Sequence, residues 1–324
     1  MKTLSLILPI YNVEEYLSKC LNSIYSQGVN EDIFEVIAVI DGSPDNSIDV
    51  AEEYARKHKN LIVIDKENGG VSSARNEGID AAKGRYIMFI DPDDILLPDS
   101  MPAIIDNIER EHSDLMILRS FYDNSSNEIY SWKNKICAGT TITGLEAYNK
   151  RFTRGAIWGV VYCKEFLNSN NLRFPLGIKN SEDSILFMQC QILAQTVHFA
   201  DIKTYSVTER PGSASRSMDE TRLKSWFKAL DYIKNLKKEK KYRGEETSIA
   251  DGLIYSAISD ITNNAITVMG WKAKRFLKSN GIKTYLPIGK ENVRHSSSIN
   301  KLLKITINMS YDMFFLISYI RNTF

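Results

Sequence analysis

The chain has 324 residues, of which 43% are hydrophobic and 25% charged, a composition typical of an ordinary soluble globular protein. Its four cysteines form no Cys-X-X-Cys pair, which argues against a structural zinc site or a disulfide framework and predicts a reducing, cytoplasmic location. The apolar N-terminus lacks the cleavage site of a signal peptide, and no apolar run approaches the roughly 20 residues of a membrane-spanning helix.

Positive and negative charges are unevenly distributed along the chain. Residues 1–221 carry 22 basic and 32 acidic side chains, whereas residues 222–324 carry 19 basic and 8 acidic ones. Such a split predicts that the C-terminal region meets an anionic surface, either nucleic acid or a membrane.

Short apolar runs alternate with amphipathic stretches over the first 120 residues. Apolar runs between turn residues predict buried strands, and apolar residues at helical spacing predict helices. Strands are expected at residues 4–10, 34–40, 61–64, 86–90 and 115–118, and helices at residues 13–25, 48–57, 71–82 and 102–111. This alternation predicts an α/β fold with a mostly parallel sheet flanked by helices.

Polar residues directly follow three of these strands. Asn12, Asp41 and Asp91 each lie just past the end of a strand. Ligands of parallel sheets bind at the carboxyl ends of the strands, so these residues predict a binding site at that rim.

The strand at residues 86–90 is followed by three carboxylates, those of Asp91, Asp93 and Asp94. Acidic side chains this close together repel one another, and a hard divalent cation such as Mg²⁺ is the simplest way to neutralise them. The alternative is an ordinary turn in which Asp93 or Asp94 caps the following helix.

The loop after the first strand has no Gly-rich turn, which argues against a dinucleotide-binding Rossmann site and against a P-loop. Tyr11 is placed to stack on a base, and Asp41 to accept a hydrogen bond from a ring N–H such as that of uracil. Arg75, early in the third helix, is placed to reach a phosphate. The alternatives are a tyrosine packed at the sheet edge, an aspartate that caps a helix and an arginine on a solvated helix face.

Five segments, in this order and spacing, resemble a family 2 glycosyltransferase with the GT-A fold. They are PIYNVEEYLSKCLNSI, VIDGSPDNS, NGGVSSARNEGI, GRYIMFIDPDD and NLRFPLGIKNSEDSILF, the last followed by YSVTERPGSASRS. The resemblance covers residues 3–217.

The resemblance implies a nucleotide-sugar site at the predicted rim. Pro9, Tyr11 and Asp41 would hold the base, with Asn12 beside them. Asp41 corresponds to the second aspartate of the family's Asp-Asp-Gly-Ser turn, and Ile40 stands where the first one is usual. This departure leaves the base contact intact and removes a second carboxylate.

The resemblance also implies how the donor diphosphate would be bound. Arg75 would face the phosphates, and Asp91 and Asp93 would be the DXD pair that meets a bound Mg²⁺ or Mn²⁺, with Asp93 as the direct ligand.

Asp183 would be the catalytic base, with Glu182 beside it. A single base opposite the leaving group gives one displacement and inversion at the anomeric carbon. The alternative for this pair is an acidic helix start.

Three further residues have weaker assignments. Arg210 and Ser213 lie in a Pro-Gly loop that would close over the donor, or else in an ordinary surface turn. Trp158 would line the acceptor pocket, or else be a buried strand residue.

The sequence predicts a GT-A catalytic domain at residues 1–217, with a nucleotide-binding half (1–120) and an acceptor and catalytic-base half (121–217). Residues 218–324 form a basic, mainly helical region. Its last stretch places apolar residues at helical spacing: Leu302, Ile305, Met309, Met313, Leu316 and Ile320. This pattern predicts a helix lying on an anionic membrane surface. The alternative is a helix that packs on the catalytic domain or across a homodimer. A nucleic-acid partner is disfavoured because the front domain is acidic.

The expected function is metal-dependent, inverting transfer of a sugar from a UDP-sugar to a hydroxyl of a saccharide or lipid-linked acceptor. The expected setting is bacterial cell-surface polysaccharide synthesis, in the cytoplasm or at the inner face of the cytoplasmic membrane. The alternative is a non-catalytic nucleotide-sugar-binding protein that acts through its basic tail. A nucleotidyltransferase would need a Gly-rich loop with an arginine after the first strand, which this chain lacks.

Overall fold

The computed structural model describes residues 2–122, 128–129, 131–179, 181–208, 220–239, 244, 247–288 and 305–323. The chain divides into two compact units. The first consists of Met1–Gly177 with Leu193–Pro211, and the second of Ile178–Ile192 with Gly212–Phe324. Residues 178–192 therefore group with the C-terminal helices, although the sequence prediction drew its boundary at residue 217. The functional division of residues 1–217 into two halves stays a prediction.

The first unit alternates strands and helices, and each element predicted from the sequence lies within a few residues of its expected bounds. The elements are β1 (Leu4–Ile10), α1 (Glu14–Tyr25), β2 (Phe34–Asp41), α2 (Ser47–Lys57), β3 (Leu61–Lys66), α3 (Val71–Ala81), β4 (Tyr86–Phe89), β5 (Ile95–Leu96), α4 (Ser100–Glu111), β6 (Leu115–Tyr122), β7 (Glu128–Ile129), β8 (Thr141–Ile142), α5 (Gly144–Asn149), β9 (Val160–Cys163), α6 (Lys164–Ser169) and β10 (Val197–Val207).

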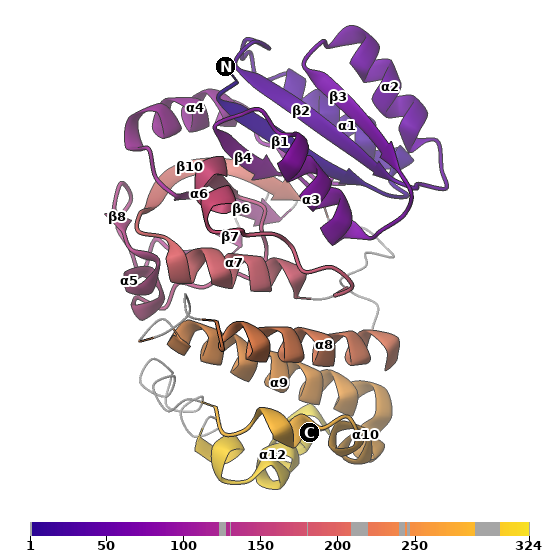
Figure 1. Cartoon of the computed structure of the whole chain (residues 1–324), viewed down its shortest axis with the longest axis vertical. Coiled ribbons are helices and arrows are strands. Elements are labelled where there is room, and N and C mark those ends of the chain that lie inside the picture. The colour runs from indigo at the N-terminus through magenta and orange to yellow at the C-terminus, as the bar shows by residue number, and fades with distance from the viewer. Residues whose placement is uncertain are drawn as a thin grey trace. The chain divides into compact units, whose positions relative to one another are not determined.

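The strands of the described residues form one sheet in the order β3-β2-β1-β4-β9-β6-β10-β5, with β7 on β6 and β8 on β10 (Figure 1). β1 to β4 pair in parallel, with Leu4 opposite both Phe34 and Tyr86. β9 runs antiparallel between β4 and β6. The predicted α/β class is confirmed, and the sheet becomes mixed beyond its first four strands. Because β1, β2 and β4 are parallel neighbours, their carboxyl ends open onto one rim.

Helices pack on both faces of the sheet, and every residue of β1, β2 and β4 is buried. Alternate residues of β1, among them Leu6 and Leu8, share one continuous core with α1, α2 and α4. On the other face, α3 approaches β1 so closely that a Cβ on Gly78 would lie 2.3 Å from Cγ2 of Ile7. Burial on both faces explains why these strands are unbroken apolar runs.

Hydrogen bonds tie together the loops that follow β1 and β2. The carboxylate of Asp45 accepts from the Glu14 amide at 2.8 Å, the Ser47 amide at 3.2 Å and the Ser43 hydroxyl at 2.5 Å. One side chain thus satisfies first-turn amides of both α1 and α2. The Asn12 amide donates to Ser43 Oγ at 2.8 Å. These bonds fix two of the three loops at the rim.

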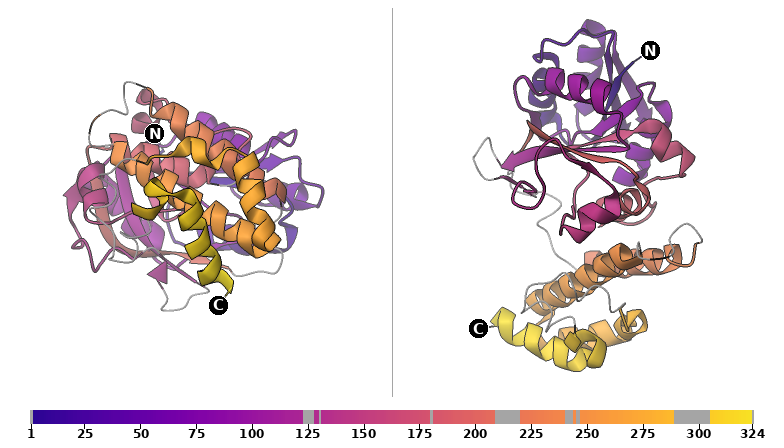
Figure 2. Two further views of the ribbon diagram at one scale, coloured as in Figure 1. Left: turned by 90° about the horizontal axis from the view of Figure 1, so that it is seen from below. Right: turned by 90° about the vertical axis from the view of Figure 1, so that its left-hand side faces the viewer.

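The second unit is helical. It contains α7 (Glu182–Leu193), α8 (Glu220–Leu236), α9 (Thr247–Met269), the 3-10 turns η1 (Gly270–Lys272) and η2 (Ile282–Tyr285), α10 (Ala273–Ser279) and α12 (Tyr311–Thr323). α8 lies beside α9, and α10 and α12 also pack on α9 (Figures 1 and 2). None of the helices in the described ranges is both long enough and apolar enough to cross a bilayer.

Asp45→Asn tests the junction of the two loops. Partial burial would raise the pKa of Asp45, but the hydrogen bonds from Ser43, Glu14 and Ser47 lower that pKa to about 2. A lowered pKa means that the carboxylate stabilises the fold above its unfolded pKa of about 3.9, and that this contribution is lost as the pH falls towards 2. We expect the variant to lose about 1 kcal/mol at pH 7 and to show a flatter dependence of stability on pH between about 5 and 2.

Urea unfolding across that pH range measures both effects. Asp49→Asn, at an exposed carboxylate of the same helix α2, is the control. An equal loss of stability in the two variants at every pH would contradict the assignment.

Candidate functional site

The acidic segment after β4 forms a tight turn. The Asp94 amide donates to the carbonyl oxygen of Asp91 at 3.0 Å. Helix α4 begins only at Ser100, with Asp99 as its N-cap residue. The alternative in which Asp93 or Asp94 caps this helix is therefore wrong, while the turn itself is confirmed.

Arg75 reaches this turn from α3 on the neighbouring face of the sheet. Its Nη2 lies 3.1 Å from Oδ1 of Asp91, and its guanidinium lies 5.2 Å from the centre of the Phe174 ring. Arg75 is only 3% exposed, so the alternative of a solvated helix face is wrong. A buried arginine beside a partly exposed carboxylate can bind an anion that enters the same rim.

Asp94 is the most deeply buried of the three carboxyl groups, at 3% exposure. Its Oδ1 accepts a hydrogen bond from the Thr208 amide at 2.7 Å. Burial, followed by the negative charges of Asp91 and Asp93, raises the pKa of Asp94 to about 8. The rim therefore concentrates negative potential that a cation would relieve.

Tyr205 of β10 stabilises the acidic turn through its hydroxyl group. Its buried hydroxyl accepts a hydrogen bond from the Asp91 amide at 2.8 Å and also bonds to the Asp94 carboxylate. Trp158 stacks on the Tyr205 ring, with centroids 5.3 Å apart and an interplanar angle of 1°. The guanidinium of Arg154 lies over the Trp158 ring, with its central carbon 5.5 Å from the ring centre. Trp158 is thus placed next to the acidic turn, and its acceptor role stays a prediction.

The acidic turn does not form a closed metal cage. Among the residues that the structure describes, no three histidine, cysteine or acidic side chains converge as metal ligands. The turn does fit a cation that is only partly held by protein, because Mg²⁺ commonly takes one or two carboxylates and completes its shell with water and substrate phosphates. Asp91 and Asp93 are the carboxylates that are only partly buried.

Asp41, at the end of β2, holds the loop that precedes α3. Its Oδ1 accepts from Lys66 Nζ at 2.8 Å and from the Gly69 amide at 2.9 Å, and its Oδ2 accepts from the Gly70 amide at 2.8 Å. The carboxylate is buried and engaged with the chain itself. Contact of Asp41 with a nucleotide base stays a prediction. It would use a lone pair of a carboxylate oxygen that is not engaged by these three hydrogen bonds.

The other predicted base-binding residues lie on the β1 side of the rim. Pro9 is buried within β1, opposite Val39 of β2. Tyr11 is 51% exposed, so its ring is accessible for stacking and the alternative of a packed edge tyrosine is wrong. Asn12 has φ 55°, a left-handed conformation that asparagine adopts more readily than most residues.

The predicted catalytic base lies in the second unit. Glu182 and Asp183 lie in the first turn of α7, which is the acidic helix start named as the alternative for this pair, and the catalytic role stays a prediction. Their placement beside the donor site stays a prediction. Arg210 and Ser213 lie outside the described residues.

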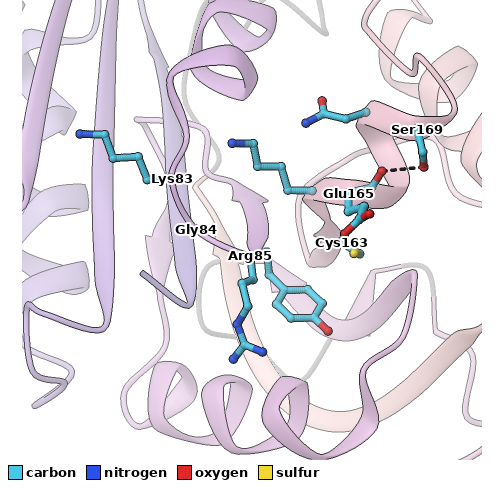
Figure 3. Close-up of a pocket in the computed structure, with 9 residues that line it drawn as sticks. Lys83, Gly84, Arg85, Cys163, Glu165 and Ser169 are labelled. Carbon is cyan, nitrogen blue, oxygen red and sulfur yellow. Dashed lines mark hydrogen bonds between the residues drawn. The ribbon is translucent and has the colours of Figure 1, made fainter. Parts of the chain in front are cut away.

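A hollow of about 710 Å³ lies elsewhere in the first unit, between the start of β4 and α6 (Figure 3). Lys83, Arg85 and Glu165 are among its lining residues, and Lys83 and Arg85 point in different directions. It opens at the amino end of β4, away from Asp91. The polar rim, and not this hollow, is the candidate site, because only the rim combines convergent charges with a perturbed carboxyl pKa.

Two residues of the site had no assigned role in the sequence. Tyr205 appears only as the first letter of YSVTERPGSASRS, and Lys66 lies two residues past the strand predicted at residues 61–64. Neither carries a local signal, because each acts on an aspartate far away along the chain. Gly42, next to Asp41, has φ 62°, and a Cβ there would lie 2.8 Å from the Asn68 amide, so glycine suits this position.

Comparison with known proteins gives a consistent picture. The family profile described as "Glycosyl transferase family 2" matches residues 5–167. An uncharacterized glycosyltransferase of Bacillus subtilis, EpsJ, is 33% identical over 67% of this chain and 65% of its own length. The minor teichoic acid biosynthesis protein GgaB of B. subtilis is 33% identical over 72% of this chain, but over only 26% of its own length. The chain thus spans about two-thirds of the first of these relatives and about a quarter of the second.

Solved structures share the fold. Residues 1–349 of Staphylococcus aureus TarS in complex with UDP-GlcNAc superpose with a TM-score of 0.71 at 22% identity, covering 99% of this chain and 89% of that one. A mannosyltransferase from Pyrobaculum calidifontis, in complex with GDP-Man and Mn²⁺, superposes with a TM-score of 0.54 at 14% identity, covering 98% and 86%. At these identities the likeness establishes the GT-A fold. The family profile covers half of the chain and includes the loops after β1, β2 and β4, so this chain belongs to glycosyl transferase family 2.

Proposed function

We propose that this protein is an inverting, metal-dependent glycosyltransferase that moves a sugar from a UDP-sugar to a hydroxyl of a saccharide or lipid-linked acceptor in bacterial cell-surface polysaccharide synthesis. The observation that carries the proposal is the acidic turn at the end of β4, where Arg75 meets Asp91 beside the buried Asp94. The names of the relatives support the setting, since GgaB and TarS are named for teichoic acid and poly(ribitol-phosphate) glycosylation.

The rim could bind a diphosphate in two ways, directly through a cationic side chain and indirectly through a bound divalent cation. The Arg75 guanidinium would bind a phosphate oxygen directly, while Asp91 and Asp93 would hold a divalent cation against the same group. Such a cation would supply Lewis-acid stabilisation of the charge that develops on the departing diphosphate. The complex of the Pyrobaculum neighbour with Mn²⁺ is consistent with this arrangement.

The remaining residues would serve as the catalytic base, the border of the acceptor pocket and the contacts to the uracil ring. Asp183 would take the proton of the acceptor hydroxyl as it attacks the anomeric carbon from the face opposite the leaving group, which inverts that centre. Trp158 would border the acceptor, because aromatic rings present a flat apolar surface to a sugar. Tyr11 would stack on the uracil ring and Asp41 would accept from its N–H.

We place the protein in the cytoplasm, at the inner face of the membrane, with no nucleic-acid partner. The four cysteines are free, which is consistent with a reducing compartment. The alternative for the C-terminal helices is that they form the interface of a homodimer.

The alternative function is that of a non-catalytic nucleotide-sugar-binding protein that acts through its basic tail.

Calorimetric titration of UDP, GDP and dTDP, each with Mn²⁺, with Mg²⁺ and then with EDTA, tests the proposal. We expect UDP to bind most tightly and only with metal. Preferred binding of GDP or dTDP would overturn the assigned donor, and binding of none of the three would overturn the whole proposal. A screen for release of UDP from UDP-sugars then separates turnover from mere binding.

Asp93→Ala tests the metal assignment. Removal of the carboxylate should weaken metal-dependent UDP binding at least about tenfold, which corresponds to roughly 1.4 kcal/mol. Calorimetry with Mn²⁺ is the measurement, and Asp106→Ala, at an exposed aspartate of α4, is the control. Unchanged UDP binding in Asp93→Ala would remove Asp93 from the metal site.

Tyr205→Phe tests the support beneath the turn. The variant keeps the ring that stacks on Trp158 but removes the hydroxyl that the Asp91 amide and the Asp94 carboxylate share. Loss of a buried hydrogen-bond partner costs about 1–3 kcal/mol, and we expect both a lower melting temperature and about tenfold weaker Mn²⁺ binding in the presence of UDP. Electron paramagnetic resonance of Mn²⁺ measures the binding.

Tyr86→Phe, at the amino end of β4, is the matched control for this substitution. A melting temperature lowered equally in both variants, with Mn²⁺ affinity unchanged in both, would mean that Tyr205 serves stability alone.

Asp183→Asn tests the base. The amide cannot accept the proton, so sugar transfer should fall by about 10²–10⁴-fold while UDP binding stays unchanged. Glu182→Gln should retain most of the transfer rate, which separates the two adjacent acids. Near-normal transfer by Asp183→Asn would place the base elsewhere.

A further inference from the structure

Helix α12 exposes a continuous apolar face. Met313, Leu316 and Ile320 are spaced by three and four residues and are 56%, 46% and 50% exposed. Residues 305–309 are also helical and add Met309, at 80% exposure, and Ile305. We call Met309, Met313, Leu316 and Ile320 the α12 face.

The opposite side of α12 already forms the core of the second unit. Tyr311, Phe314 and Phe315 are buried, and the Tyr311 hydroxyl lies 2.9 Å from Thr262 Oγ1 of α9. The α12 face is therefore additional to what this unit needs for folding. Large apolar side chains gathered on one exposed face mark a contact surface.

Cations border the α12 face on one side. Trp271 of η1, itself half exposed, meets Tyr319 of α12 edge-on with ring centroids 4.9 Å apart. Lys272, Arg275 and Lys278 follow it along η1 and α10 with exposed side chains, and they line a groove of about 630 Å³ with Trp271.

Asp312 holds Lys278 and two further lysines beside the helix. Its carboxylate oxygens lie 3.1 Å from Lys274 Nζ, 2.8 Å from Lys278 Nζ and 2.9 Å from Lys283 Nζ. Because three lysines surround one carboxylate, the border keeps an excess of positive charge. Hydrogen bonds from the lysines hold the pKa of Asp312 well below its usual value, so this carboxylate stays charged at neutral pH.

We propose that the α12 face, with Trp271 and the bordering cations, binds the surface of an anionic phospholipid bilayer. An amphipathic helix in the plane of a membrane buries its apolar side chains at the acyl boundary and places Lys and Arg at the headgroups, and tryptophan favours that boundary. Charge complementarity favours lipid over a second copy of the chain, because two copies joined through this face would bring their cationic borders together. The biological role of this membrane contact rests on the proposed function, since a lipid-linked acceptor would lie at such a surface.

Vesicle flotation of the full chain tests the proposal. We expect the protein to float with phosphatidylcholine vesicles that contain phosphatidylglycerol, to stay behind with pure phosphatidylcholine, and to be released by salt. The variant Met313→Ser/Leu316→Ser/Ile320→Ser should lower the partition coefficient at least about tenfold, and Lys272→Glu/Arg275→Glu should abolish the preference for phosphatidylglycerol. Leu176→Ser, at a 67% exposed leucine of the first unit, is the matched control and should float like the wild type.

Three results would overturn the proposal: no flotation of the wild type, equal flotation of the triple serine variant, or a wild-type dimer in sedimentation that this variant converts to a monomer. The last result would make the α12 face an interface between copies. The substituted side chains are exposed, so unchanged circular dichroism is expected to confirm folding. UDP calorimetry on the same proteins keeps the two proposals separable, because lipid binding without UDP binding would remove the enzyme and leave the membrane face.

Discussion

Three carboxylates follow a fully buried strand in this fold, and the structure has to keep them together although they repel one another. Asp94 carries the largest cost, since it is buried beside Asp91 and Asp93 and its pKa is raised to about 8. Two groups support the turn: Arg75 of α3 pairs with Asp91, and the Tyr205 hydroxyl of β10 bonds to the Asp91 amide and to the Asp94 carboxyl. The pKa of Asp94 stays raised in the presence of these groups, and the cation proposed to arrive with a substrate would relieve that unfavourable potential.

The rest of the rim is built around that turn before any ligand binds. Asp45 joins the loops after β1 and β2, and Asp41 fixes the loop that leads into α3, the helix that carries Arg75. The side chain proposed to bind a phosphate, that of Arg75, is therefore positioned by hydrogen bonds that begin at the loops after β1 and β2. Preorganisation of this kind lowers the entropy lost on binding.

The second unit combines two kinds of surface on one helix. The inner side of α12 packs through Tyr311, Phe314 and Phe315, while its outer side exposes Met313, Leu316 and Ile320. A helix that is apolar on both sides is not explained by one core alone. The net positive charge of residues 222–324 belongs to the same unit, so apolar and cationic groups are available together.

The sequence by itself determined the strands, the helices, the α/β class and the rim, because apolar periodicity and turn residues are local properties that survive without tertiary contacts. It also identified Asp91, Arg75 and Tyr11 as rim residues. Only the tertiary structure decided that Tyr205, 114 positions from Asp91 along the chain, supports the acidic turn. It also decided that the Asp41 carboxylate is turned onto its own loop. These contacts join segments that are distant in the chain, and nothing in either segment's local pattern records its partner.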